Sequence, residues 1–147
     1  MKLSLLLALF SFAFSENSIA KPIEKVVWLT TTQVTSEQVQ KAQKAASNTN
    51  FNYFKVDESE KLRAYFEGQF PKKLNDRPEV EKDAYLNKHI IPRIKAYAPE
   101  MMRSEIGITM AKMYRIERIP AVIINDKYVT YGLSVKDSID MYYAQGK

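Results

Sequence analysis

The sequence predicts a single α/β domain with a central mixed β-sheet, and three features of its apolar pattern carry this prediction. The order strand–helix–strand is expected over residues 25–56, and a mainly helical segment follows over residues 58–114. Residues 121–142 then show the order strand–turn–strand–helix. Strands separated by a helix favour parallel pairing with a right-handed crossover, whereas a tight turn joins antiparallel strands. The chain of 147 residues has the size of one domain.

The N-terminal residues resemble an export signal rather than part of the domain. A basic start at Lys2 precedes an apolar run, Leu3–Phe14, and Ser18 and Ala20 are small residues placed before Lys21. We expect residues 1–20 to be a cleaved signal peptide and residues 21–147 to form the domain. A membrane anchor is the alternative, but the apolar run would span only about 18 Å as a helix, against ~30 Å of hydrocarbon.

The amino-acid composition limits which kinds of reactive site and binding partner the chain can have. It contains no cysteine and one histidine, which excludes thiol–disulfide exchange and thiolate metal sites. The net charge of +5 favours acidic partners such as an anionic membrane surface, a nucleic acid or an acidic protein. An ordinary basic surface is the simpler interpretation, because no run of Lys or Arg exceeds two residues. The basic loop around Lys72, Lys73 and Arg77 lacks interleaved aromatic residues, so nucleic acid is not an expected partner.

The first predicted unit is a buried strand, a helix and a second strand. Lys25–Thr31 is rich in β-branched and aromatic residues, and Trp28 within it is expected to be a core residue. Thr35 and Gln38 have the spacing of a capping box at the start of a helix. Phe51–Val56 alternates apolar and polar residues, as a half-buried strand does.

The middle of the chain is predicted to be helical. A short helix through Glu67 is expected to be capped by Asp57 or Ser59, and a helical pattern over Glu79–Ala98 contains Pro92, which should kink or interrupt it. A final helix carries an apolar stripe formed by Met102, Ile106, Met110 and Met113. Such a stripe can be an adaptable binding surface, but it is more often core, and we expect it to be buried.

The C-terminal segment predicts a β-hairpin followed by a helix. Ala121–Asn125 is apolar, Asp126 and Lys127 form the turn, and Tyr128–Tyr131 is the returning strand. Ser134 is then expected to cap the last helix.

Two stretches of this segment resemble the thioredoxin-like fold. Residues 114–121 (YRIERIPA) resemble the segment that leads into the cis-proline of thioredoxins, and residues 132–143 (GLSVKDSIDMYY) resemble the start of their final helix. The resemblance implies a thioredoxin-like α/β fold, βαβ then ββα, with a helical insertion. It also implies a cis peptide bond before Pro120. Arg115 departs from the pattern, because glycine usually stands at that position.

A closer resemblance is to a family of small exported proteins encoded by integrating conjugative elements, distantly similar to the TrbC components of F-type conjugation. Phe54–Pro71 (FKVDESEKLRAYFEGQFP) and Ile119–Tyr142 (IPAVIINDKYVTYGLSVKDSIDMY) carry it, while Pro71–Ala98 matches only loosely. It implies a periplasmic, non-enzymatic component or assembly factor of a conjugative type IV secretion system. Its partners would be other conjugation or secretion-channel proteins of the envelope, with no cofactor, metal or small-molecule substrate.

The position of the thioredoxin reactive pair is occupied here by Thr30–Gln38, which offers hydroxyls and amides and no thiol. We expect a protein-binding edge formed by Thr30, Thr31, Thr32, Ile119 and Pro120, where an extended segment could add to the sheet. The alternative is that this edge is only part of the fold.

Two other functions stay open at this stage. One is a redox-inactive periplasmic chaperone of the disulfide-isomerase lineage, which would bind unfolded chains broadly. The other is a cysteine-free hydrolase using a threonine of residues 30–32, which would need a base beside it. His89, the only histidine, would have to supply that base, and a metal site on this lone residue is not expected.

Overall fold

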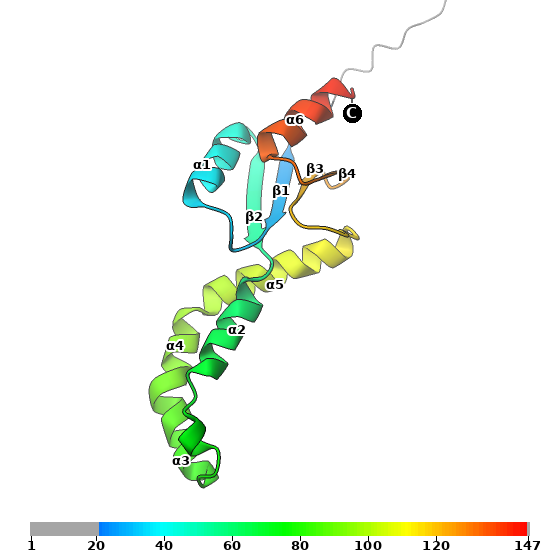
Figure 1. Ribbon diagram of the computed structural model, residues 1–147. Coiled ribbons are helices and arrows are strands. Elements are labelled where there is room, and N and C mark those ends of the chain that lie inside the picture. Colours follow the sequence, from blue (N-terminus) through cyan, green and yellow to red (C-terminus); the bar gives the residue numbers. More distant parts are fainter. Residues whose placement is uncertain (1–20, 147) are drawn as a thin grey trace, which may run out of the picture.

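A four-stranded mixed sheet with the strand order β2-β1-β3-β4 forms the centre of the protein (Figure 1). The structure is a computed structural model that describes residues 21–146, so the predicted signal peptide lies outside the described residues. β1 (Lys25–Thr30) pairs in parallel with β2 (Asn50–Lys55) and antiparallel with β3 (Ala121–Ile124). β3 and β4 (Tyr128–Tyr131) form the predicted hairpin. This mixed sheet confirms the predicted thioredoxin-like α/β fold.

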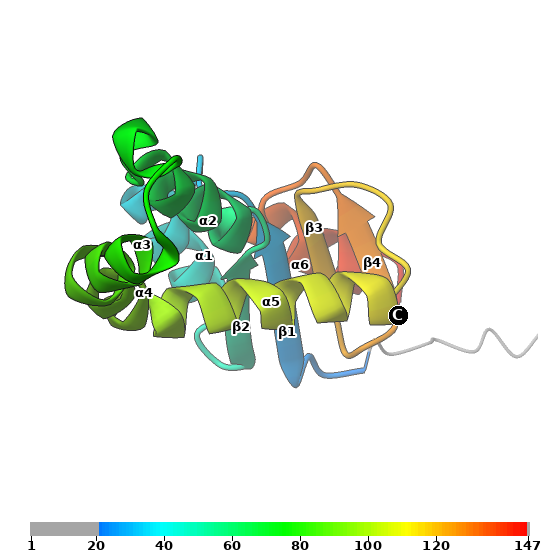
Figure 2. The ribbon, with the colours of Figure 1, turned by 90° about the horizontal axis from the view of Figure 1, so that it is seen from below.

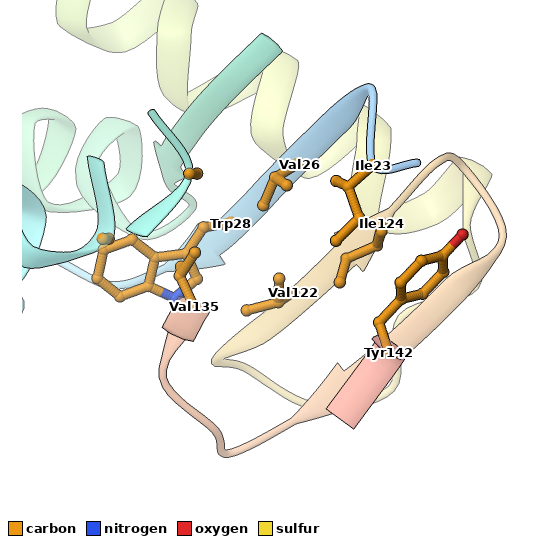
Figure 3. Packing of buried hydrophobic residues seen from close by; sticks show 9 residues of the cluster. Ile23, Val26, Trp28, Val122, Ile124, Val135 and Tyr142 are labelled. Carbon is orange, nitrogen blue, oxygen red and sulfur yellow. The ribbon is translucent and has the colours of Figure 1, made fainter. Parts of the chain in front are cut away.

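Helices cover both faces of the sheet (Figures 1 and 2). α1 (Ser36–Ala45) and α6 (Val135–Ala144) lie on one face, and α5 (Ala98–Met113) crosses the other. The alternation of side chains along β1 explains the two layers. Val26 and Trp28 belong to the apolar cluster under α1 and α6 (Figure 3), whereas Val27 and Leu29 belong to the cluster under α5.

The helical insertion forms an arm that extends away from the sheet (Figure 1). It comprises α2 (Glu58–Gly68), a 3₁₀ turn η1 (Lys72–Leu74), α3 (Glu79–Tyr85), a π-helical segment η2 (Leu86–Ile90) and α4 (Ile91–Ala96). The predicted interruption at Pro92 is confirmed, since the π-helical segment ends at Ile90 and a new α-helix begins at Ile91, one residue before the proline. Proline lacks the N–H for the helical bond and its ring crowds the carbonyl of the fourth residue before it. No helix within residues 21–146 has the length and apolarity needed to cross a membrane.

The expectation that the methionine stripe of α5 is buried was wrong. Met102 is 65% exposed and Met113 63% exposed, and Ile106 is exposed as well. The helix buries its opposite side instead: Gly107 lies against Phe54 of β2, and Ser104 accepts a hydrogen bond from the Ser59 N–H of α2. Gly107 lets α5 lie close to β2, so the large side chains of the stripe point to solvent, and of the stripe residues only Met110 packs partly into the core.

The turn that follows α5 brings the chain back to the sheet through a Schellman motif. The Arg115 N–H donates to the Lys112 carbonyl at 3.2 Å, and the Ile116 N–H donates to the Ala111 carbonyl at 2.8 Å. Arg115 has a φ of 53°, the left-handed conformation that favours glycine. Arg115 therefore stands in place of the glycine of the thioredoxin pattern, but its backbone has the conformation that a glycine would adopt easily.

A buried polar contact ties α6 to the sheet. The hydroxyls of Thr130 in β4 and Ser138 in α6 lie 2.7 Å apart, and both side chains are buried. The Ser138 hydroxyl also donates to the Ser134 carbonyl at 2.8 Å. Ser134 itself caps α6 as predicted, since its hydroxyl accepts from the Asp137 N–H.

Candidate protein-binding site

The predicted binding edge forms where β1 ends and β3 begins. Leu29 pairs with Ala121 in the antiparallel register, which brings Thr30 and Pro120, the next residues toward that end of the sheet, to the same edge. The Ile119–Pro120 peptide bond is cis, the isomer that the resemblance implies. The sheet register thus brings residues that are 90 positions apart in the sequence to one place.

The threonine loop is held mainly by bonds inside the fold. The Asp57 carboxylate accepts from the Thr32 N–H at 2.7 Å and from the Thr32 hydroxyl at 2.9 Å. Lys61 forms an ion pair with the same carboxylate at 2.7 Å. Partial burial pushes the pKa of Asp57 up, but the hydrogen bonds from Lys61 and Thr32 outweigh this effect and hold that pKa below its ordinary value. Asp57 therefore anchors the loop to the start of α2.

This role of Asp57 corrects the sequence prediction that Asp57 or Ser59 caps α2. Asp57 occupies the N-cap position without a side-chain capping bond, because its carboxylate is engaged by Thr32. Ser59 is buried, and its N–H donates to the Ser104 hydroxyl of α5 at 3.1 Å. The capping box of α1 is confirmed, since Thr35 and Gln38 exchange both of its hydrogen bonds.

The five residues of the predicted edge differ in their accessibility. Thr30 is only 5% exposed, and Thr32 uses its N–H and hydroxyl on Asp57. Thr31 and Ile119 are half-buried, and Pro120 is exposed. The accessible part of the edge is therefore centred on Pro120 rather than on the threonines.

A groove of about 780 Å³ begins at Pro120 and runs between α1 and α6. Its volume lies within the range of roughly 300–1,000 Å³ that is typical of ligand-binding pockets. Trp28 lines the groove, as do Ala42 and Ala45 of α1. Val135 and Ile139 of α6 line the other side. Figure 3 shows Trp28 beside Val135 at the start of α6.

Trp28 has two roles in this arrangement. The side chain is 7% exposed, so the prediction that it is a core residue is confirmed. It also lines the groove, and its indole Nε1 is the one buried side-chain nitrogen or oxygen within residues 21–146 that has no hydrogen-bond partner. A buried donor without a partner carries a desolvation cost and is uncommon in folded proteins.

The rim of the groove is mainly basic. Lys41, Lys44 and Lys136 line it, together with one acid, Asp140. Lys136 pairs with Asp140 at 2.5 Å, and Lys41 pairs with Glu37 at 2.7 Å on the exposed side of α1. Lys44 has no carboxylate within ion-pair distance among the described residues.

His89 does not support hydrolysis by the threonine loop. It is exposed on η2 in the arm, where its ring lies 4.7 Å from that of Tyr85. Figure 1 shows this part of the arm, between α3 and α4, well separated from the end of β1. The base that the hydrolase hypothesis requires is therefore not placed beside Thr30–Thr32. Across residues 21–146, no group of three or more His, Asp or Glu side chains has the arrangement of a metal site.

Sequence reasoning identified Pro120 but missed the groove beside it. Val135 and Ile139 have the spacing of one apolar helix face, yet this pattern could not show that α1 faces them with small side chains. The available signal was Ala42 and Ala45 on α1, combined with lysines at positions 41, 44 and 136. Only the packing of α1 against α6 brings these features into one surface.

Comparison with known protein families identifies a match over most of the chain. The family model described as "Protein of unknown function (DUF1525)" matches residues 29–145, which include all strands and helices from the end of β1 to α6. No curated protein and no solved structure matches the chain.

Proposed function

The chain belongs to the DUF1525 family, and we propose that it is a non-enzymatic, exported protein that acts in conjugative DNA transfer through protein contacts. In this proposal it works in the periplasm as a component or assembly factor of a type IV secretion system. Its partners are other conjugation or secretion-channel proteins of the envelope.

The observation that carries the protein-binding part is the groove that begins at Pro120. It combines an apolar lining from Trp28, Val135 and Ile139 with an accessible mouth at Pro120. Apolar concave surfaces with a few polar groups at the rim are the usual sites of specific binding. The chain has no cysteine, so a site at this end of a thioredoxin-like fold serves binding rather than thiol exchange.

The conjugative setting is supported by the sequence motifs of Phe54–Pro71 and Ile119–Tyr142. Both lie in parts of the fold that form the candidate site. The first contains Asp57, which anchors the threonine loop, and the second contains Pro120 and the α6 side of the groove. The apolar run Leu3–Phe14 supports export.

The test is a transfer experiment in a donor strain that carries the gene on its own element. The gene is deleted, and DNA transfer to a recipient is counted with and without complementation. We expect transfer to fall on deletion and to return with the wild-type gene but not with Leu133→Asp. Leu133 is half-buried in the groove lining, and a carboxylate there opposes binding of an apolar side chain.

A matched control places the same charge on the other side of the domain. Met102→Asp changes a residue that is exposed on α5, so it should restore transfer as well as wild type does. Unchanged transfer in the deletion strain would refute the conjugative function. If Leu133→Asp and Met102→Asp restored transfer equally well, the groove would have no role in transfer.

A further inference from the structure

We propose that the groove between α1 and α6 binds an acidic amphipathic helix of a partner protein, with apolar side chains of that helix resting on Trp28. This inference rests on the proposed function only in that the partner is a protein. It adds the secondary structure and the charge of the segment that is bound.

The first argument is the shape of the groove. Its α1 wall contains the small residues Ala42 and Ala45, and its α6 wall contains Val135 and Ile139. The lining of α1 runs from Gln38 to Ala45, which is about 10 Å along a helix axis, or two turns. Two turns of a bound helix present apolar residues at positions i, i+3 or i+4, and i+7 on one face.

The second argument concerns the main chain. Both long walls are helices, whose N–H and carbonyl groups are bonded within the helix except at the ends. They offer no free strand edge to an extended peptide. Recognition along these walls has to use side chains, which is the way a helix binds in a groove.

The third argument is charge. Lys41, Lys44 and Lys136 line the groove together with Asp140, and two of these lysines are already paired, Lys41 with Glu37 and Lys136 with Asp140. Lys44 has no carboxylate partner among the described residues, so it is available for an acidic residue of another chain. Complementary charge around an apolar centre favours association and selects the correct partner.

The fourth argument is continuity with the Pro120 edge. Pro120, Gly132 and Leu133 line the same groove as Ala45. A helix lying in the groove would therefore extend from the edge that the sequence predicts to the C-terminal turn of α1. One bound segment would therefore cover both the Pro120 edge and the groove between α1 and α6.

The experiment uses the purified chain and two synthetic peptides of about 14 residues, roughly four helical turns. Both carry leucines on one face and lack tryptophan and tyrosine, and they differ only in flanking glutamates or flanking lysines. Trp28 is the only tryptophan of the chain and lines the groove, so its fluorescence reports binding directly. We expect the acidic peptide to change this emission saturably and more weakly at high salt, and the basic peptide to have no effect.

Variants of the groove identify the site. Lys44→Glu should weaken binding of the acidic peptide about three- to tenfold, the range expected when one exposed attraction becomes a repulsion. Ala45→Phe should weaken binding of the acidic peptide, because Ala45 is half-buried in the α1 wall and a phenyl ring there would project into the groove. Lys112→Glu is the matched control, since Lys112 lies in the last turn of α5 as Lys44 lies in the last turn of α1.

The outcomes separate this inference from the proposed function. Equal binding of both peptides, no binding of either, or equal affinity of Lys44→Glu and Lys112→Glu would overturn the acidic-helix assignment. If the acidic peptide binds as expected but gene deletion leaves transfer unchanged, the groove assignment stands and the conjugative function fails. If deletion abolishes transfer but no peptide binds, the function stands and the groove assignment fails.

Discussion

Gly107 in α5 should tolerate no larger side chain, although it lies in the interior of a helix where alanine is normally preferred. A Cβ atom built on Gly107 would lie 2.5 Å from Phe54 Cβ and 3.3 Å from both Phe54 Cγ and Val56 Cγ1. Comfortable carbon–carbon contacts are about 3.5–4.0 Å, so α5 would have to recede from β2 by about 1 Å. The Phe54 Cβ is fixed by the strand backbone, so a side-chain rotation cannot relieve the contact.

The magnitude follows from two opposing effects. Overpacking of this kind costs about 1–3 kcal/mol, and the higher helix propensity of alanine returns about 1 kcal/mol. We expect Gly107→Ala to lower the free energy of unfolding by up to about 2 kcal/mol, which corresponds to a fall in Tm of about 4 °C for each kcal/mol in a domain of this size. Gly68→Ala is the matched control, because Gly68 ends α2 and a Cβ there meets nothing within 4 Å.

The free energy of unfolding of both variants is measured by urea titration, with the helical circular dichroism signal as the readout. The slope of the unfolding free energy with urea should stay the same, so that a change in midpoint reports stability. Gly68→Ala should be neutral or stabilising by up to about 1 kcal/mol. If Gly107→Ala proved as stable as Gly68→Ala, the close approach of α5 to β2 would be wrong.

Three further predictions concern polar and backbone features. Asp57→Asn should cost about 1–2 kcal/mol at neutral pH, because the bonds to Thr32 and Lys61 lose their charge. The folded-state pKa of Asp57 lies below its ordinary value, so this stability is present above the ordinary pKa and is lost as the pH falls through the lowered one. The two stability curves should therefore converge as the solution is acidified, and a difference that does not shrink with falling pH would contradict the assignment. Arg115→Gly should stabilise the protein by about 0.5–1 kcal/mol in thermal unfolding, because φ is positive there; a loss would show that the arginine side chain contributes. Ser138→Ala should cost about 1–2 kcal/mol by leaving the buried Thr130 hydroxyl without this partner, and unchanged urea unfolding would refute that role.

Local patterns were sufficient for most of the secondary structure. The capping box of Thr35 and Gln38, the break before Pro92 and the hairpin turn at Asp126 each depend on residues close in sequence. Caps and turns are satisfied by groups within a few residues of one another, so the sequence displays them directly. The fold class followed from the order of these elements.

The face that each helix buries was harder to predict. The methionine stripe of α5 looks like a buried face by periodicity, yet the side that carries Ser104 and Gly107 is buried instead. The amphipathic pattern considers one helix alone, whereas close packing rewards small residues where β2 approaches α5. Similarly, Asp57 has the position of a helix cap but bonds to Thr32, 25 residues earlier in the chain.

The sequence by itself determined the α/β order of elements, the absence of thiol chemistry and the position of Pro120 as a candidate site. The tertiary structure decided which surface at that site is available: the threonines are largely taken up by the fold, and a groove between α1 and α6 opens beside the proline. The physical reason is that caps, turns and strand propensity act over a few residues. A groove exists only where side chains from distant elements fail to fill the space between them.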